Sequence, residues 1–114
     1  MKSEDIVEGL NQQLKREREE KFKNVKGLFV LQRNVDINES FKVYKTFTAT
    51  LWYVQNKKKY MIFQEVVTGR YPAGEEEKAS RELNIKLIQG VLTFSKTEQW
   101  ELIKRGEYGI PYNE

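Results

Sequence analysis

Two absences limit the chemistry that this chain can perform: its 114 residues include no His and no Cys. Metal sites built on imidazole or thiolate, and nucleophile pairs such as Ser–His or Cys–His, are therefore excluded within it. Three acids of the expected sheet region, Asp36, Glu39 and Glu65, show no spacing that brings a pair to one substrate atom. The chain also has no phosphate-binding loop, dinucleotide fingerprint or calcium loop. We expect no enzyme activity, no cofactor and no metal site.

Phosphate binding is a second chemistry to consider, because three adjacent lysines stand between two aromatic runs in LWYVQNKKKYMIF. The lysines would contact phosphates while Trp52 or Tyr60 stacked on bases, which predicts weak, sequence-independent nucleic-acid binding. The candidate residues for this alternative function are Lys57, Lys58, Lys59 and Tyr60. The simpler interpretation is that lysines at a hairpin tip keep it soluble and deter the pairing of strand edges.

The segments on either side of these lysines predict a β-hairpin. A first strand is expected from Phe41 to Gln55; its odd positions from Phe41 to Tyr53 form an apolar face with Lys45 as the one exception, while its even positions are rich in Thr. A second strand runs from Tyr60 to Thr68. A tight turn at Asn56-Lys57 would pair Tyr53 with Tyr60, Leu51 with Ile62 and Trp52 with Met61. A turn centred on Lys57-Lys58 would pair Trp52 with Phe63 instead.

In either register, large apolar side chains gather on the Thr-rich face of the hairpin. Such a patch, if exposed, marks an interface, and aromatic residues and Met are enriched in interfaces. The expected contact residues are Tyr44, Trp52, Met61 and Phe63. This pattern predicts a small protein-interaction module, and self-association is the favoured form. The alternative is that the N-terminal or the last helix covers this face within one chain.

Charge is segregated along the sequence, although the net charge is only +3. The stretch 41–60 carries five lysines and no acid, giving +5, whereas 73–82 carries four acids against two bases, giving −2. Segregated charge favours oriented docking, including docking between two copies of the chain. A protein partner, and another copy in particular, is therefore expected before a nucleic acid.

An N-terminal helix is predicted from about residue 4 to 23, after Ser3 as a possible N-cap. Its apolar row is Ile6, Leu10 and Leu14, and the following run KREREEK predicts a solvated surface. We expect this charged helix to project from the body or to pack against a partner. The chain that follows, 27–70, is expected to be a β-meander.

Two helices are predicted in the C-terminal part. The first runs from Glu75 to Gln89 with Ala79, Leu83 and Leu87 inward and ends at Gly90, and an extended 91–94 leaves room for a fourth short strand. A capping box, Ser95 to Glu98, opens a last helix that ends near Gly106, with Trp100 and Ile103 as its inward residues. Residues 107–114 are expected to form a surface tail.

The sequence therefore predicts one small α+β domain over residues 1–114, in the order α-β-β-β-α-α, with a three-stranded antiparallel sheet. The 1–26, 27–70 and 71–106 segments would form its charged helix, meander and helical parts. The helix–three strands–helix order is similar to that of double-stranded-RNA-binding domains, which contact phosphates and 2′-hydroxyls. Their second helix begins with lysines, whereas Glu75-Glu76-Glu77 begins it here and would repel phosphate.

No apolar run of about 18 residues is present, so we expect no membrane span. The first residues, MKSEDIVEGLNQQ, carry charges where a signal peptide needs an apolar stretch. With no Cys for disulfides, a cytoplasmic location is the expectation.

Overall fold

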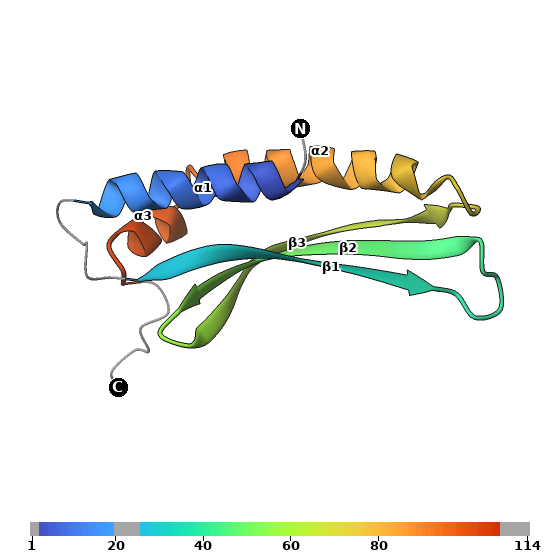
Figure 1. The fold of residues 1–114 in the computed structure, drawn as a ribbon, viewed down its shortest axis with the longest axis horizontal. Coiled ribbons are helices and arrows are strands. Elements are labelled where there is room, and N and C mark those ends of the chain that lie inside the picture. Colours follow the sequence, from blue (N-terminus) through green and yellow to red (C-terminus); the bar gives the residue numbers. More distant parts are fainter. Residues whose placement is uncertain (1–2, 20–25, 108–114) are drawn as a thin grey trace.

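The computed structural model describes residues 3–19 and 26–107, and it confirms the expected order of elements. The helices and strands are α1 (Ser3–Arg18), β1 (Gly27–Ile37), β2 (Tyr44–Gln55), β3 (Lys58–Arg70), α2 (Glu76–Phe94) and α3 (Glu98–Lys104). All three helices lie on one face of an antiparallel sheet whose strand order is β1-β2-β3 (Figure 1). The predicted fold class, α+β with a three-stranded sheet in a small single domain, is therefore confirmed.

The hairpin between β2 and β3 has the tighter of the two predicted turns. Gln55 pairs with Lys58, and the two residues between them, Asn56 and Lys57, have φ of 53° and 63°. Two consecutive positive φ values define a type I′ turn, whose twist matches that of the flanking strands. Asn is among the residues that tolerate this conformation best. The register therefore begins as expected, with Tyr53 opposite Tyr60.

The register then shifts by one residue, because β3 contains an extra residue relative to β2 between Met61 and Phe63. Trp52 pairs with Met61, but Leu51 pairs with Phe63 rather than with Ile62. The expectation that Phe63 shares a face with Trp52 and Met61 is wrong. The bulge turns Phe63 toward the helices, since side chains beyond an inserted residue change faces.

The strand expected to begin at Phe41 begins three residues later, because the connection between β1 and β2 includes residues 38–43. Asn38 Oδ1 accepts hydrogen bonds from the amides of Ser40 (2.9 Å) and Phe41 (2.8 Å), which closes an Asx turn. As a result β2 begins at Tyr44, and Phe41 is an exposed loop residue at 65% exposure rather than a core residue. β1 extends from Gly27 to Ile37.

The core consists of two clusters between the sheet and the helices. The cluster nearer the β2–β3 turn joins α1, α3 and the end of α2 to the sheet through Leu10, Leu14, Phe29, Leu51, Tyr53, Phe94, Trp100 and Ile103. The other joins α2 to the far half of the sheet through Phe47, Ala49, Val67, Ala79, Leu83 and Leu87. The inward residues expected for α2 and α3 are therefore buried. Because Leu10 and Leu14 are buried on the sheet, α1 does not project from the body. Phe22 and Val25, and residues 108–114 of the expected tail, lie outside the described residues.

The helix α2 continues through Gly90 to Phe94, so the predicted stop at Gly90 and the extended 91–94 are wrong. A Cβ on Gly90 would lie 2.6 Å from Cε2 of Phe63, and the glycine therefore allows the Phe63 ring to lie against the helix backbone. Within the described residues the sheet has three strands and no fourth. The N-cap of α3 is Thr97 rather than Ser95, and its hydroxyl accepts from the Trp100 amide at 3.4 Å.

Arg18, the last residue of α1, is buried even though it belongs to the charged run. Its guanidinium donates to the Tyr53 hydroxyl and to the Ile103 carbonyl, and the Tyr53 hydroxyl donates to Gln55 Oε1. Gln55 Nε2 in turn donates to the Gly106 carbonyl at 3.2 Å. Burial raises the pKa of Tyr53 above 10.0, against the opposing effect of Arg18, so the phenol is neutral at neutral pH. These contacts connect α1, β2 and the end of α3.

The position of Lys45 on the otherwise apolar face of β2 is explained by an ion pair with Glu76. Its ammonium lies 2.7 Å from Glu76 Oε1 at the start of α2, and the lysine side chain is only 10% exposed. Glu76 Oε2 accepts from the Gly74 amide at 2.8 Å. The hydrogen bond from Lys45, with those from backbone amides, lowers the pKa of Glu76 from 4.5 to about 2. This ion pair fixes the N-terminal end of α2 on the sheet.

Gly27→Ala should lower the free energy of unfolding by about 1 to 3 kcal/mol, the usual range for overpacking a filled site. The new methyl group would lie 2.8 Å from Tyr53 Cζ and 3.0 Å from the Val54 carbonyl oxygen, and the Tyr53 ring is held by Arg18 and Gln55. Gly9→Ala is the matched control: nothing lies within 4 Å of its added Cβ, so this helix position should gain up to about 1 kcal/mol. Urea unfolding measures both, and equal effects of the two substitutions would contradict the packing described for Tyr53.

The Glu76–Lys45 pair should make the wild-type chain lose stability as pH falls. The folded pKa of Glu76 is about 2 and its unfolded value about 4.5, so its stabilising effect is complete above 4.5 and is lost as the pH approaches 2. In Glu76→Gln this part of the pH dependence of the urea midpoint should be absent. Glu77→Gln, which removes a neighbouring carboxylate that is 79% exposed, should leave the pH dependence close to that of the wild type.

Candidate functional site: the open face of the sheet

The face of the sheet opposite the helices is not covered by any other described residue (Figure 1). It consists of the even-numbered residues of β1 and β2 with Lys59, Met61, Gln64, Val66, Thr68 and Arg70 of β3. The alternative in which the N-terminal or the last helix covers this face is wrong for α1 and α3 as described, because both pack on the opposite face.

Apolar residues gather on the open face at the end near the β2–β3 turn. Val30, Trp52 and Met61 form one row across the three strands, and Leu28 and Val54 adjoin it in the next row. We call these five residues the hairpin-end patch. Leu28, Val30 and Met61 are 49%, 40% and 54% exposed, so the patch is in contact with solvent. Three strands thus contribute to one contiguous apolar surface.

Trp52 is held in the centre of this patch by two neighbours. Its indole Nε1 donates to Gln32 Oε1 at 2.9 Å, and the Lys59 ammonium lies 4.3 Å from the ring centroid. The hydrogen bond satisfies the only polar group of the indole. The ammonium is attracted by the electron-rich face of the ring. Trp52 is therefore positioned on the open face before any partner binds.

The middle of the open face is polar, and its side chains bond to one another. Gln64 Nε2 donates to Thr50 Oγ1 at 2.9 Å, and the hydroxyls of Thr68 and Thr46 are 3.2 Å apart. These pairs join β2 to β3 across the face. A partner lying on this region would meet polar groups that already have partners, which reduces the cost of covering them.

The four residues expected to form an interface do not lie together. Trp52 and Met61 are opposite one another in the patch, whereas Tyr44 lies eight residues along β2 from Trp52, about 26 Å at 3.3 Å per residue. Tyr44 packs edge-on against Phe41, with centroids 6.4 Å apart. Phe63 lies on the helix-covered face. Sequence reasoning missed Leu28, Val30 and Val54, although the alternation of β1 places the first two on one face.

The four residues of the nucleic-acid alternative are also divided between surfaces. Lys57 is in the turn, Lys59 is on the open face, and Lys58 pairs with Gln55 on the other side. Tyr60 packs against the core cluster of Phe29 and Trp100. Of the two rings proposed for stacking, Trp52 lies under Lys59 on the open face, whereas Tyr60, on the same side of β3 as Lys58, packs against the core.

In residues 3–19 and 26–107, no three acidic side chains come close enough together to hold a metal ion. No helix in that part of the chain is long and apolar enough to cross a membrane.

Comparison with known proteins gave no relative: no family model, no curated protein and no solved structure matches this chain.

Trp52 should be much more accessible to quenchers than the other tryptophan, Trp100, which is 3% exposed. In Trp100→Phe, acrylamide should quench the remaining emission several-fold more strongly than in Trp52→Phe. The ratio of the iodide to the caesium quenching constant should be higher for Trp52 than for free N-acetyltryptophanamide, because the Lys59 ammonium over the ring attracts the anion and repels the cation. Lys59→Gln should lower this ratio, and an unchanged ratio in this variant would contradict the described contact.

Proposed function

We propose that this chain is a non-enzymatic protein-interaction module that self-associates through the open face of its sheet. The observation that supports the proposal best is the hairpin-end patch, in which exposed apolar residues of β1 and β3 flank a Trp on β2 that is already fixed in place. A cytoplasmic location, expected from the sequence, belongs to the same proposal.

A two-fold arrangement of two stacked sheets accounts for the composition of the patch. If the axis runs along the strands, Trp52 lies over Trp52 of the second copy, while Val30 on one edge strand lies over Met61 on the other. Lys59 then lies over Leu28 rather than over another lysine. Stacked sheets pack about 10 Å apart at an angle of about −30°, and the helices would form the outer layers.

Opposite charges at the other end of the face support the same arrangement. Asp36 on β1 and Arg70 on β3 are both exposed, and they lie on opposite edges of the open face. Rotation about an axis along the strands brings Arg70 of one copy near Asp36 of the other. This pairing favours one orientation of the two sheets over the reverse.

The area of the face predicts a weak dimer. Three strands of about 11 residues cover roughly 500 Å², at 4.8 Å between strands and 3.3 Å per residue. Stable interfaces bury about 800 Å² per partner, and those below about 600 Å² are weak or transient. We therefore expect a dissociation constant of about 10 to 100 μM.

Sedimentation equilibrium tests this proposal. The mass should rise from 13.6 kDa toward twice that value as the concentration passes through the expected range. Met61→Glu should weaken association at least about tenfold, because it places a charge in the apolar contact. Leu92→Glu, at an exposed apolar position on α2, is the matched control and should leave the mass profile unchanged. A strict monomer up to about 1 mM would contradict the proposal.

Charge exchange tests the orientation of the two copies. Asp36→Lys and Arg70→Asp should each weaken the dimer, since each leaves like charges facing one another. The double variant restores opposite charges at the same positions and should recover most of the lost affinity. Losses that simply add in the double variant would exclude the proposed axis while leaving self-association itself to the Met61 test.

A second candidate, weak binding of single-stranded nucleic acid, is favoured by one observation: the Lys59 ammonium lies over the accessible Trp52 ring, with Lys57 nearby in the turn. Bases would stack on Trp52 while the lysines contact phosphates. Two phosphate contacts predict a slope of only about −1.4 for log K against log salt. Titration of an oligothymidine at about 50 mM salt, followed by Trp52 emission in Trp100→Phe, should show saturable quenching below about 10 μM if this function is present.

A further inference from the structure

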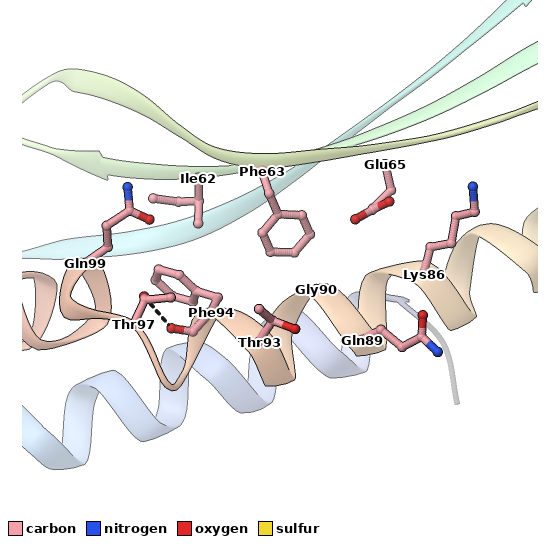
Figure 2. A pocket seen from close by; sticks show the side chains of 10 residues that line it. All are labelled: Ile62, Phe63, Glu65, Lys86, Gln89, Gly90, Thr93, Phe94, Thr97 and Gln99. Atoms are coloured by element: carbon pink, nitrogen blue, oxygen red, sulfur yellow. Dashed lines mark hydrogen bonds between the residues drawn. The ribbon is translucent and has the colours of Figure 1, made fainter.

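A second surface, independent of the open face, lies between the edge strand β3 and helix α2. It is an open groove of about 500 Å³ (Figure 2). The apolar side chains of Ile62, Phe63 and Phe94 project into it, and Figure 2 shows the first two pointing from β3 toward the helix. Lys86, Gln89 and Thr93 of α2 form the opposite wall. The bulge creates this apolar lining, because it turns Phe63 away from the open face.

The strand beside the groove has main-chain groups available for pairing. β3 pairs with β2 on one side only, and the Lys86 ammonium donates to the outward carbonyl of Val66 at 2.9 Å. Since the direction alternates along an antiparallel strand, Gln64 and Thr68 also direct their amide and carbonyl groups outward. Within the described residues, the bond from Lys86 is the one hydrogen bond to the outward main-chain groups of Gln64, Val66 and Thr68.

On the opposite edge of the sheet, the outward main-chain groups of Phe29 in β1 are already hydrogen-bonded. Asn11 of α1 donates to the Phe29 carbonyl at 2.9 Å and accepts from the Phe29 amide at 2.6 Å. One side-chain amide thus occupies both outward main-chain groups of Phe29. On β3, Lys86 satisfies one carbonyl and leaves the outward amides, so a strand added here could pair with β3 while its side chains enter the groove.

The groove also contains an acid that has no ion pair among the described residues. Glu65 is half-buried in the groove, two residues from Phe63 on the same face of β3. Its carboxylate is more than 4.0 Å from the Lys86 ammonium, which bonds to Val66 instead. A basic group entering the groove beside the apolar floor would therefore meet an available carboxylate.

We propose that an extended peptide segment of a partner protein binds β3 as a fourth strand and fills this groove. The main chain of the segment pairs with the outward groups of Gln64, Val66 and Thr68, as in other complexes formed by strand addition. Opposite Phe63 it places a large apolar residue, and opposite Glu65 a Lys or Arg. Residues on one face of a strand alternate, so the recognised pattern is an apolar and a basic residue two positions apart.

Selection from a random seven-residue peptide library displayed on phage tests the recognised pattern. Selection on the wild-type chain should enrich peptides with an apolar and a basic residue at i and i+2. Selection on Glu65→Gln should keep the apolar residue and lose the basic one. Enrichment without this spacing, or an identical result on Glu65→Gln, would overturn the proposal.

The most enriched peptide, synthesised and titrated into ¹⁵N-labelled protein, tests the mode of binding. Amide shifts should concentrate on β3 and α2. The same peptide with N-methyl groups on the amides that face β3 keeps its side chains and should bind at least about tenfold more weakly. Val66→Pro removes an outward N–H and should weaken binding similarly, while Val35→Pro at an outward position of β1 serves as the control.

Two results would show that the peptide does not occupy the groove between β3 and α2. Shifts confined to the residues around Trp52 would assign the peptide to the open face, and β3 shifts that follow protein concentration without peptide would assign the groove to a second copy. Met61→Glu should leave peptide affinity unchanged, so failure of the proposed self-association and failure of this proposal are distinguishable.

Discussion

Ile62 is the extra residue that β3 inserts between two stretches of regular pairing with β2, and both candidate surfaces depend on it. Before the insertion, Met61 shares the open face with Trp52; after it, Phe63 faces α2 and lies against Gly90. A regular strand would place Phe63 on the open face and would remove the apolar residue that lines the groove. The same bulge keeps Val67 over the core opposite Phe47, so the far half of the sheet can hold Ala79 and Leu83 of α2.

Much of the fold could be predicted because it is encoded locally. The alternation in β2, the turn at Asn56-Lys57 and the i+4 spacing of Ala79, Leu83 and Leu87 each depend on residues close in sequence. The errors have longer-range causes. No Gly or Pro marks the bulge, and Ile62 is an ordinary strand residue. Gly90 was interpreted as a helix end, whereas the ring of Phe63, distant in sequence, gives the glycine another role.

The candidate site was predicted less well than the fold, for the same reason. Trp52 and Met61 were placed together correctly, but Tyr44 and Phe63 were assigned to one surface by alternation alone. Alternation states which face a residue occupies, not how far along the strand it lies or where the register shifts. Arg18 shows the same limit: it looks like one more solvated charge, yet its partners are Tyr53 and the Ile103 carbonyl, 35 and 85 residues away.

The contact between Asn11 and Phe29 has a consequence for the fate of the chain when it is partly unfolded. The side-chain amide of Asn11 occupies the outward groups of Phe29 on the outer edge of β1 only while α1 lies on the sheet. Detachment of α1 would free that edge together with the apolar side chains beneath the helix, and an uncovered edge of this kind is a template on which further chains add as strands. Docking of α1 on the sheet therefore opposes the addition of further chains at this edge, besides covering the core.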